Sequence, residues 1–246
     1  MQLSWFLPRS VNKVPMDPIR VWFSLISGEA ATPVKLVVEE WRRSGPAFLH
    51  PDILAVAAPD FKETVDLAYR QTLFTVGWPD SATFRIGIES IDPLAFPLPY
   101  GFEGDSHFGA VAVGLAQAVA RAYPDHFRAG AKHLLPVLQA VSLERVAVAA
   151  ALDSKKGDFK PVGCIRTKLD SFCMLEVSRP AVCVISPTQN LTADSGPLLA
   201  VPLQNDPDPY VSVNGHQALP LLRARDPIDV FVQLWEAQAR TFAGCL

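Results

Sequence analysis

The sequence lacks the features that mark several classes of protein. Its 246 residues contain no apolar run near the roughly 18 residues that span a membrane, so we expect no transmembrane helix. The opening residues MQLSWFLPRSVNK lack a basic stretch followed by a sustained apolar run, which argues against a secretory signal. The net charge is −3, without the basic excess typical of nucleic-acid binders. We therefore expect a cytoplasmic protein that binds neither nucleic acid nor a membrane.

Motifs for metals, disulfides and nucleotides are also missing. The four cysteines form no CxxC pair and have no histidine at ligand spacing, which argues against a zinc site or a disulfide scaffold. No GxxxxGK[ST] phosphate loop occurs, so the chain encodes no ATP-driven motor of that type. These absences also disfavour a small-molecule enzyme that holds a phosphorylated cofactor. We expect no cofactor and no metal.

The sequence does contain enough apolar residues for a large core. Hydrophobic residues make up 49% of the chain, and the 22 prolines are spread over several segments rather than one low-complexity tract. Alternating patterns predict strands at 19–26, 34–41, 52–58, 83–91, 144–152 and 181–186, with short strands within 198–203 and 210–215. Helical patterns predict helices at 59–77, 107–122 and 226–244 and within 160–177, while 124–139 is either a short helix or an inserted loop. This order indicates an α/β or α+β sandwich.

The stretch EGDSHFGAVAVGLAQAVA, residues 103–120, places one serine immediately before a helix of small apolar residues. Serine is a favoured helix N-cap, so Ser106 has an ordinary structural interpretation. The same position also suits a nucleophile, because free backbone N–H groups and the positive end of the helix dipole can stabilise an oxyanion there. The two interpretations are compatible.

Three segments together resemble the proteolytic domain of the Lon peptidase family. The region 83–117 is similar to the stretch around the family's catalytic serine, and GDFKPVGCIRTKLDS at 157–171 is similar to its G-x-V-x-P-V-G-G-I-x-x-K signature. AVCVISPTQN is similar to the strand and Pro-x-x-Asn loop that follow, ending at Asn190. The resemblance implies an α+β sandwich with a mixed sheet and packed helices, and a catalytic dyad of Ser106 and Lys168. It covers residues 34–240.

The resemblance also implies a domain division and a set of partners. We expect an N-terminal extension over 1–33 and the proteolytic domain over 34–246, with an insertion near 123–142. The implied activity is that of a serine endopeptidase, a hydrolase that cuts peptide bonds through an acyl-enzyme without ATP of its own. The implied substrate is a polypeptide. A separate ATPase, a regulatory partner and a homo-oligomer remain open.

A lysine can activate a serine only when its neutral amine is populated, and desolvation favours that form. Four apolar side chains are candidates for a desolvating wall around Lys168: Val148, Ile165, Leu169 and Phe172. We interpret His107 as a pocket-rim or surface residue, Cys164 as a small buried thiol, and His126 and His133 as structural.

Departures from the family pattern support an alternative without catalysis. Asp105 adjoins the serine, and a nearby carboxylate favours the charged ammonium of lysine. The family's Thr-Gly-Glu, whose threonine helps to hold the lysine, is replaced by Ala150, Ala151 and Leu152. Ser154 or Thr167 would have to supply the missing hydroxyl. The alternative is therefore an inactive Lon-like domain that serves as a binding or scaffold module.

Overall fold

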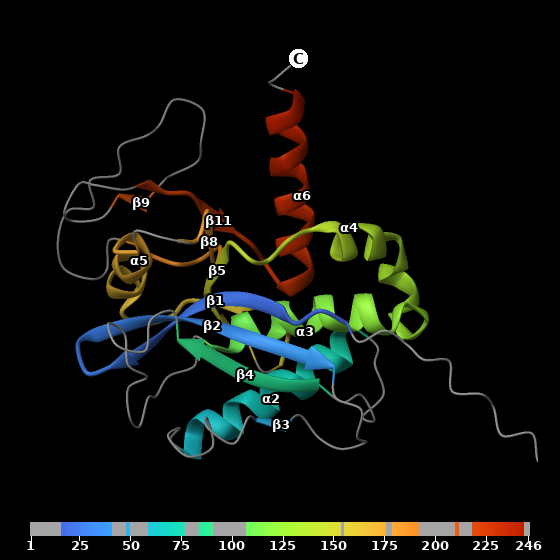
Figure 1. Cartoon of the computed structure of the whole chain (residues 1–246), viewed down its shortest axis with the longest axis horizontal. Helices are drawn as coiled ribbons and strands as arrows, with labels where there is room; N and C mark the ends of the chain where they lie inside the picture. Colours follow the sequence, from blue (N-terminus) through green and yellow to red (C-terminus); the bar gives the residue numbers. More distant parts are fainter. Residues whose placement is uncertain are drawn as a thin grey trace, which may run out of the picture.

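A mixed β-sheet with helices on both faces forms the centre of the molecule (Figure 1). The computed structural model describes residues 16–40, 48–49, 59–76, 84–90, 107–153, 155–175, 179–191, 210–211 and 218–243. Within these residues the sheet has seven strands in the order β11-β8-β5-β1-β2-β4-β3. The strands are β1 (Ile19–Ser27), β2 (Ala30–Glu40), β3 (Phe48–Leu49), β4 (Phe84–Ser90), β5 (Val146–Ala149), β8 (Val182–Ile185) and β11 (Leu221–Arg223).

The sheet combines a parallel half with an antiparallel half. Strands β11, β8, β5 and β1 are parallel to one another, whereas β2 is antiparallel to both β1 and β4. Two further pairs are β6 (Ala151–Leu152) with β7 (Phe159–Lys160), and β9 (Tyr210–Val211) with β10 (Ala218–Leu219). The coarse prediction of a mixed α+β fold is confirmed.

The predicted helices at 59–77, 107–122 and 226–244 are present, as is the one within 160–177. They are α2 (Pro59–Val76), α3 (His107–Ala122), α6 (Pro227–Ala243) and α5 (Ile165–Cys173). The open region 124–139 forms two 3₁₀ turns, η1 (Pro124–His126) and η2 (Ala129–Leu134), followed by the short α4 (Leu135–Ala140). None of the helices described is long and apolar enough to cross a membrane. The strands predicted at 52–58 and within 198–203 lie outside the described residues.

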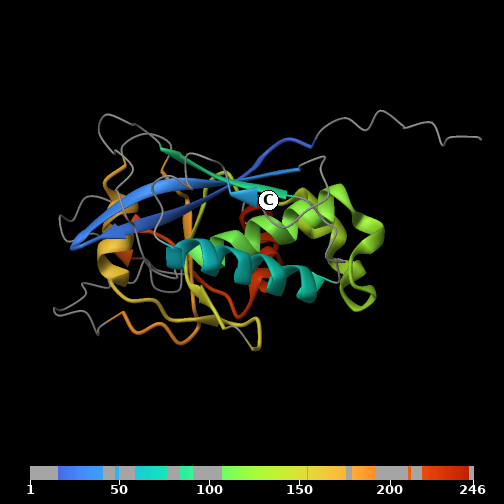
Figure 2. The same ribbon diagram turned by 90° about the horizontal axis from the view of Figure 1, so that it is seen from below.

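Alternation along β1 separates two apolar layers. Val21, Phe23 and Leu25 belong to the larger core, together with residues of α2, α3, α4 and α6. Trp22 faces the opposite side and belongs to a smaller cluster built around α5. Figure 2 shows α2 and α3 side by side beneath the sheet, in the larger layer. Helix α5 therefore covers one face of the sheet while the other helices cover the second face.

Strand β1 is an inner strand of the sheet. It pairs with β2 along its whole length, from Ile19 opposite Val38 to Ser27 opposite Ala30, and it also pairs with β5. A two-residue turn joins β1 and β2, with Gly28 at a φ of 60°, which glycine adopts at little cost. The expected division at residue 33 falls inside this hairpin. Residues 19–33 are thus part of the central sheet rather than an appendage to it.

The expected insertion at 123–142 is fastened to α3 by side-chain amides. Gln117 Nε2 donates to the carbonyls of Leu138 and Val141 at 2.7 and 2.6 Å. In the reverse direction, Gln139 Nε2 donates to the Ala120 carbonyl at 2.8 Å. Since Gln117 is buried, its bonds tie the end of α4 and the residue after it to α3, and Arg121 Nη2 adds a second bond to the Val141 carbonyl at 3.3 Å.

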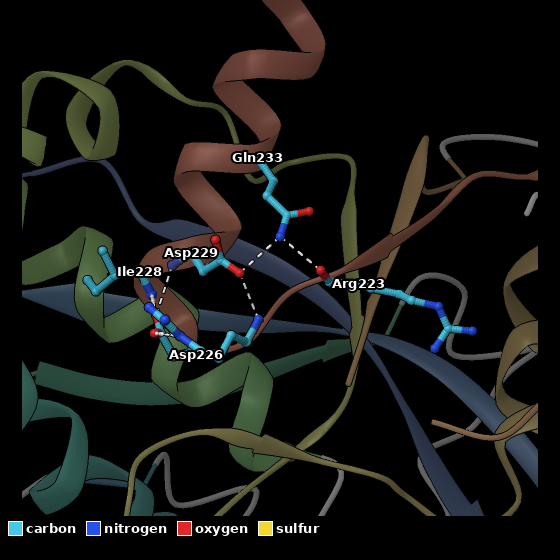
Figure 3. Close-up of polar contacts among 6 residues, drawn as sticks. Arg223, Asp226, Ile228, Asp229 and Gln233 are labelled. Carbon is cyan, nitrogen blue, oxygen red and sulfur yellow. Dashed lines mark hydrogen bonds and ion pairs between the residues drawn. The ribbon is translucent and has the colours of Figure 1, made fainter. Parts of the chain in front are cut away.

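Helix α6 is anchored at its first turn, as Figure 3 shows. Asp226 caps the helix, because its Oδ1 accepts from the backbone N–H groups of Ile228 and Asp229 at 2.9 Å each. Gln233 Nε2 donates to Asp229 Oδ2 and to the Arg223 carbonyl at 2.9 and 2.8 Å. These bonds join the start of α6 to strand β11. The far end of α6 extends beyond the other elements (Figure 1).

Candidate active site

The first turn of α3 rests directly on the chain between β5 and β6. The Gly109 N–H donates to the Ala150 carbonyl at 3.1 Å, and this bond satisfies one of the N–H groups that a helix start leaves unpaired. A Cβ at position 109 would lie 2.4 Å from the same carbonyl oxygen, so only glycine permits this approach. Helix α3 is buried on every side, with Arg121 the exception among its residues. Glycine at position 109 therefore allows the start of α3 to lie directly against the end of β5.

Ser106 immediately precedes α3 but lies outside the described residues, as does Asp105. The separation of the Ser106 hydroxyl from the Lys168 amine therefore stays a prediction. The structure does place the residue that follows the serine: His107 is buried, with 2% of its surface exposed, and its ring stacks on that of Phe108 at 5.2 Å. The expectation of a pocket-rim or surface histidine is wrong, because α3 has no solvent-facing side in its first turn.

Lys168 lies on α5 and is 5% exposed. Among the side chains that the structure describes, it is the only Lys, Arg, Asp or Glu classed as buried. Lysine is rarely this buried, because removing the ammonium from water is costly. Its backbone N–H donates to the Cys164 carbonyl at 3.1 Å, which places Lys168 within the first turn of the helix.

Three of the four residues predicted to form a wall around Lys168 lie in the apolar layer of α5. Ile165, Leu169 and Phe172 lie on α5 within the smaller apolar cluster, which also contains Ala149 and Ala151 of the adjoining strands. Val148 belongs to the other layer instead, so its inclusion in the wall is wrong. Alternation along β5 turns residue 148 toward α3 while residues 147 and 149 face α5.

Helices α3 and α5 both pack against the segment of residues 149–151. Ala150 belongs to the layer of α3 and carries the carbonyl that Gly109 contacts, whereas Ala149 and Ala151 belong to the layer of α5. The helix that follows Ser106 and the helix that carries Lys168 therefore pack against opposite faces of one short stretch of chain.

Two serines that the sequence reading missed bind the backbone of Lys168. Ser171 Oγ donates to the Lys168 carbonyl at 2.7 Å, and Ser24 Oγ lies 2.7 Å from Ser171 Oγ. Both serines are buried. Ser171 follows Lys168 by three residues. That spacing puts both residues on one helix face, so the sequence could have indicated Ser171 as a neighbour of Lys168. These serines are not the residues expected to replace the family's threonine. Of those two, Thr167 is half-buried and Ser154 lies outside the described residues.

Cys164 has the left-handed backbone conformation that glycine favours. Its φ is 52° and its ψ is 34°, and it is the only non-glycine residue with positive φ in the described part of the chain. The resemblance puts the family's second signature glycine at this position. The expectation of a buried thiol is wrong, because Cys164 is exposed at the start of α5. Of the cysteines that the structure describes, Cys173 and Cys183 are buried, and burial raises the pKa of Cys173 to about 11.

The histidines of the insertion and a lysine pair in a turn have ordinary surface positions. His126 and His133 are exposed in the insertion, and Lys155 and Lys156 are exposed in the turn between β6 and β7. No cluster of three or more His, Cys, Asp or Glu side chains that could hold a metal ion occurs among the described residues. No protein-family model matches the sequence, and no curated protein matches it.

Proposed function

We propose that this chain is a Lon-like serine endopeptidase domain in which Lys168 acts as the base for Ser106. The observation that carries the proposal is the burial of Lys168, at 5% exposure, within a helix whose preceding residues follow the signature of that family. A buried lysine favours its neutral amine, which is the form able to accept a proton. The proposal is also supported by the packing of α5 and α3 against the same short stretch of chain, since Ala149 and Ala151 lie in the layer of α5 while the Ala150 carbonyl accepts from the start of α3.

The proposed reaction has two stages. The Lys168 amine takes the proton of the Ser106 hydroxyl as the oxygen attacks the carbonyl carbon of the peptide bond. The tetrahedral intermediate collapses, the C–N bond breaks, and the proton passes from Lys168 to the leaving amine. A water molecule then attacks the acyl-enzyme with Lys168 again as base, releasing the carboxylic acid and restoring the serine. The positive end of the α3 dipole, at the start of the helix, is suited to stabilise both oxyanions.

The proposed substrate is an unstructured polypeptide. The chain has no nucleotide-binding loop with which to drive the unfolding of a stable protein. A separate ATPase, a regulatory partner and a homo-oligomeric state remain compatible with this proposal, as does a cytoplasmic location.

A second candidate is a Lon-like domain without catalysis that binds or scaffolds another protein. The observation that favours it is the pair Ala150 and Ala151, both fully buried, where the resemblance puts the family's threonine and glycine. The serine hydroxyls found near Lys168, those of Ser24 and Ser171, bond to its carbonyl. Asp105, adjacent to the serine in sequence, also favours a charged lysine.

Substitution of Lys168 by arginine separates these candidates. Arginine keeps the positive charge but does not give up its proton at any accessible pH. We expect Lys168→Arg to abolish cleavage of an unstructured fluorogenic peptide as completely as Ser106→Ala does. The wild-type rate should rise with pH between about 6 and 9 as the neutral amine is populated. A serine-directed phosphonate should label Ser106 in the wild type, as read by mass spectrometry of the peptides.

The matched control is Lys156→Arg, which makes the same change in an exposed turn and should leave the rate unchanged. Circular dichroism checks that all variants are folded. Substantial activity in Lys168→Arg would show that lysine is not the base. A folded wild type that cleaves no peptide and leaves Ser106 unlabelled would favour the scaffold.

A further inference from the structure

The loop that follows β8 is bonded to the segment that leads into α5. Gln189 Oε1 accepts from the Val162 N–H at 2.8 Å, and Gln189 Nε2 donates to the Val162 carbonyl at 3.3 Å. One side chain thus satisfies both backbone groups of a single residue, as a neighbouring strand would. Ser186 Oγ donates to the Phe159 carbonyl at 3.0 Å, at the other end of the same segment. Gln189 is 7% exposed, so water does not compete freely for these bonds.

Arg223 holds this loop from the opposite side. Its Nη1 donates to the carbonyls of Pro187 and Gln189 at 3.2 and 3.1 Å, with the Ser186 carbonyl at 3.5 Å. Figure 3 shows the Arg223 guanidinium pointing away from Gln233, which binds the Arg223 carbonyl from α6. The guanidinium therefore fixes the backbone from which the Gln189 side chain extends.

The segment held by Gln189 determines where Lys168 lies. Val162 is buried in the same apolar cluster as Ile165, the first residue of α5. Between them lies Cys164 in its left-handed conformation, and the Cys164 carbonyl accepts the Lys168 N–H. A shift of Val162 would therefore be transmitted to the first turn of α5. In enzymes, a displacement of about 1 Å at the reacting groups can cost on the order of 100-fold in rate.

We propose that Gln189 is a positioning residue for Lys168, acting through Val162 and the start of α5. This inference rests on the proposed function, since it assigns Gln189 a part in that reaction. Gln189 does not touch the substrate in this scheme. Its loss should lower kcat and leave KM nearly unchanged, because it affects the placement of the base rather than the binding of the peptide.

The decisive variant is Gln189→Met, which keeps the length of the side chain but removes both hydrogen bonds. We expect kcat on an unstructured fluorogenic peptide to fall about 10–100-fold. Gln189→Glu retains an acceptor for the Val162 N–H but loses the donor to its carbonyl, so its kcat should be intermediate. Gln139→Met is the matched control, since it removes an amide-to-carbonyl bond in the insertion, and its kcat should equal that of the wild type.

Two further measurements do not depend on cleavage. Amide hydrogen exchange over residues 159–168 should accelerate in Gln189→Met while exchange in α3 is unchanged. An amine-reactive reagent should label Lys168 faster in Gln189→Met than in the wild type, with exposed Lys155 and Lys156 as internal references. If Gln189→Met fails to fold, Arg223→Lys serves in its place, because an ammonium cannot reproduce the geometry of the guanidinium fork.

The outcomes separate this inference from the proposed function. Unchanged exchange and unchanged Lys168 labelling in Gln189→Met would overturn the positioning role, whether or not the wild type is active. A fall in kcat without faster exchange would overturn it too. A wild type that neither cleaves peptide nor labels Ser106 would refute the peptidase, while the exchange and labelling results would still decide whether Gln189 holds the segment that carries Lys168.

Discussion

The contact between α3 and the strand beneath it predicts a large cost for Gly109→Ala. The added Cβ would lie 2.4 Å from the Ala150 carbonyl oxygen, a backbone atom that cannot rotate away, so either α3 or the strand must shift. Overpacking of this kind costs about 1–3 kcal/mol. The shift also breaks the bond from the Gly109 N–H, and a buried unpaired donor costs about 1–3 kcal/mol. The higher helix propensity of alanine returns up to about 1 kcal/mol.

We therefore expect Gly109→Ala to lower the free energy of unfolding by about 3 kcal/mol, and Tm by roughly 6–12 °C. Urea denaturation, followed by fluorescence of the buried Trp22, measures the free energy, and calorimetry measures Tm. Gly130→Ala is the matched control, because a Cβ at that position meets no atom within 4 Å. Gly114→Ala should lie between the two, since its Cβ would contact a movable methyl of Val38 at 2.9 Å. Equal stabilities of Gly109→Ala and Gly130→Ala would refute this reasoning.

Two other side chains give predictions about stability. Gln117→Leu removes the amide donor to the Leu138 carbonyl and leaves the Val141 carbonyl only its longer bond from Arg121, so it should cost about 1–3 kcal/mol in urea denaturation. It should also accelerate amide exchange over residues 135–143, and unaltered exchange there would contradict the role of Gln117. Burial, with a smaller contribution from Glu40, raises the pKa of Tyr123 to about 12 from 10.0. The folded state therefore holds the phenol proton more tightly, so stability should fall as pH rises from 10 toward 12. Tyr123→Phe should remove that part of the fall, and an identical pH profile in both proteins would argue against it.

The helices were the most predictable part of the fold. Helix α3 consists of small apolar residues, and α2 begins with a proline and an aspartate, so local composition marks where each begins. The order of the strands was not predictable in the same way. Residues 1–33 were expected to form an extension with a strand at 19–26, whereas β1 is paired on both sides in the central sheet. This was not predictable because the parallel partner of β1, strand β5, is remote in sequence. Local alternation identifies a strand but does not identify its neighbour.

The candidate site was predictable only where it depends on local sequence. The spacing of Ile165, Leu169 and Phe172 along α5 indicates the apolar face on which Lys168 lies. The approach of Ser24 to that helix depends on how β1 packs against α5, which no local pattern encodes. The exposure of Cys164 was predicted wrongly for a similar reason. Its residue type indicates burial, but its position in the turn that starts α5 leaves it exposed.

The inner position of β1 affects how the chain is made. The Trp22 indole donates to the Glu144 carbonyl at 2.9 Å, a partner 122 residues further along. During synthesis, at about 5–20 residues per second, the β1–β2 hairpin therefore waits roughly 6–24 s for the residues that cover its second edge. Throughout that interval Trp22 and an open strand edge face the surroundings of the ribosome, and such edges attract other chains. Because β5, β8 and β11 all follow residue 145, the complete sheet can form only late in translation.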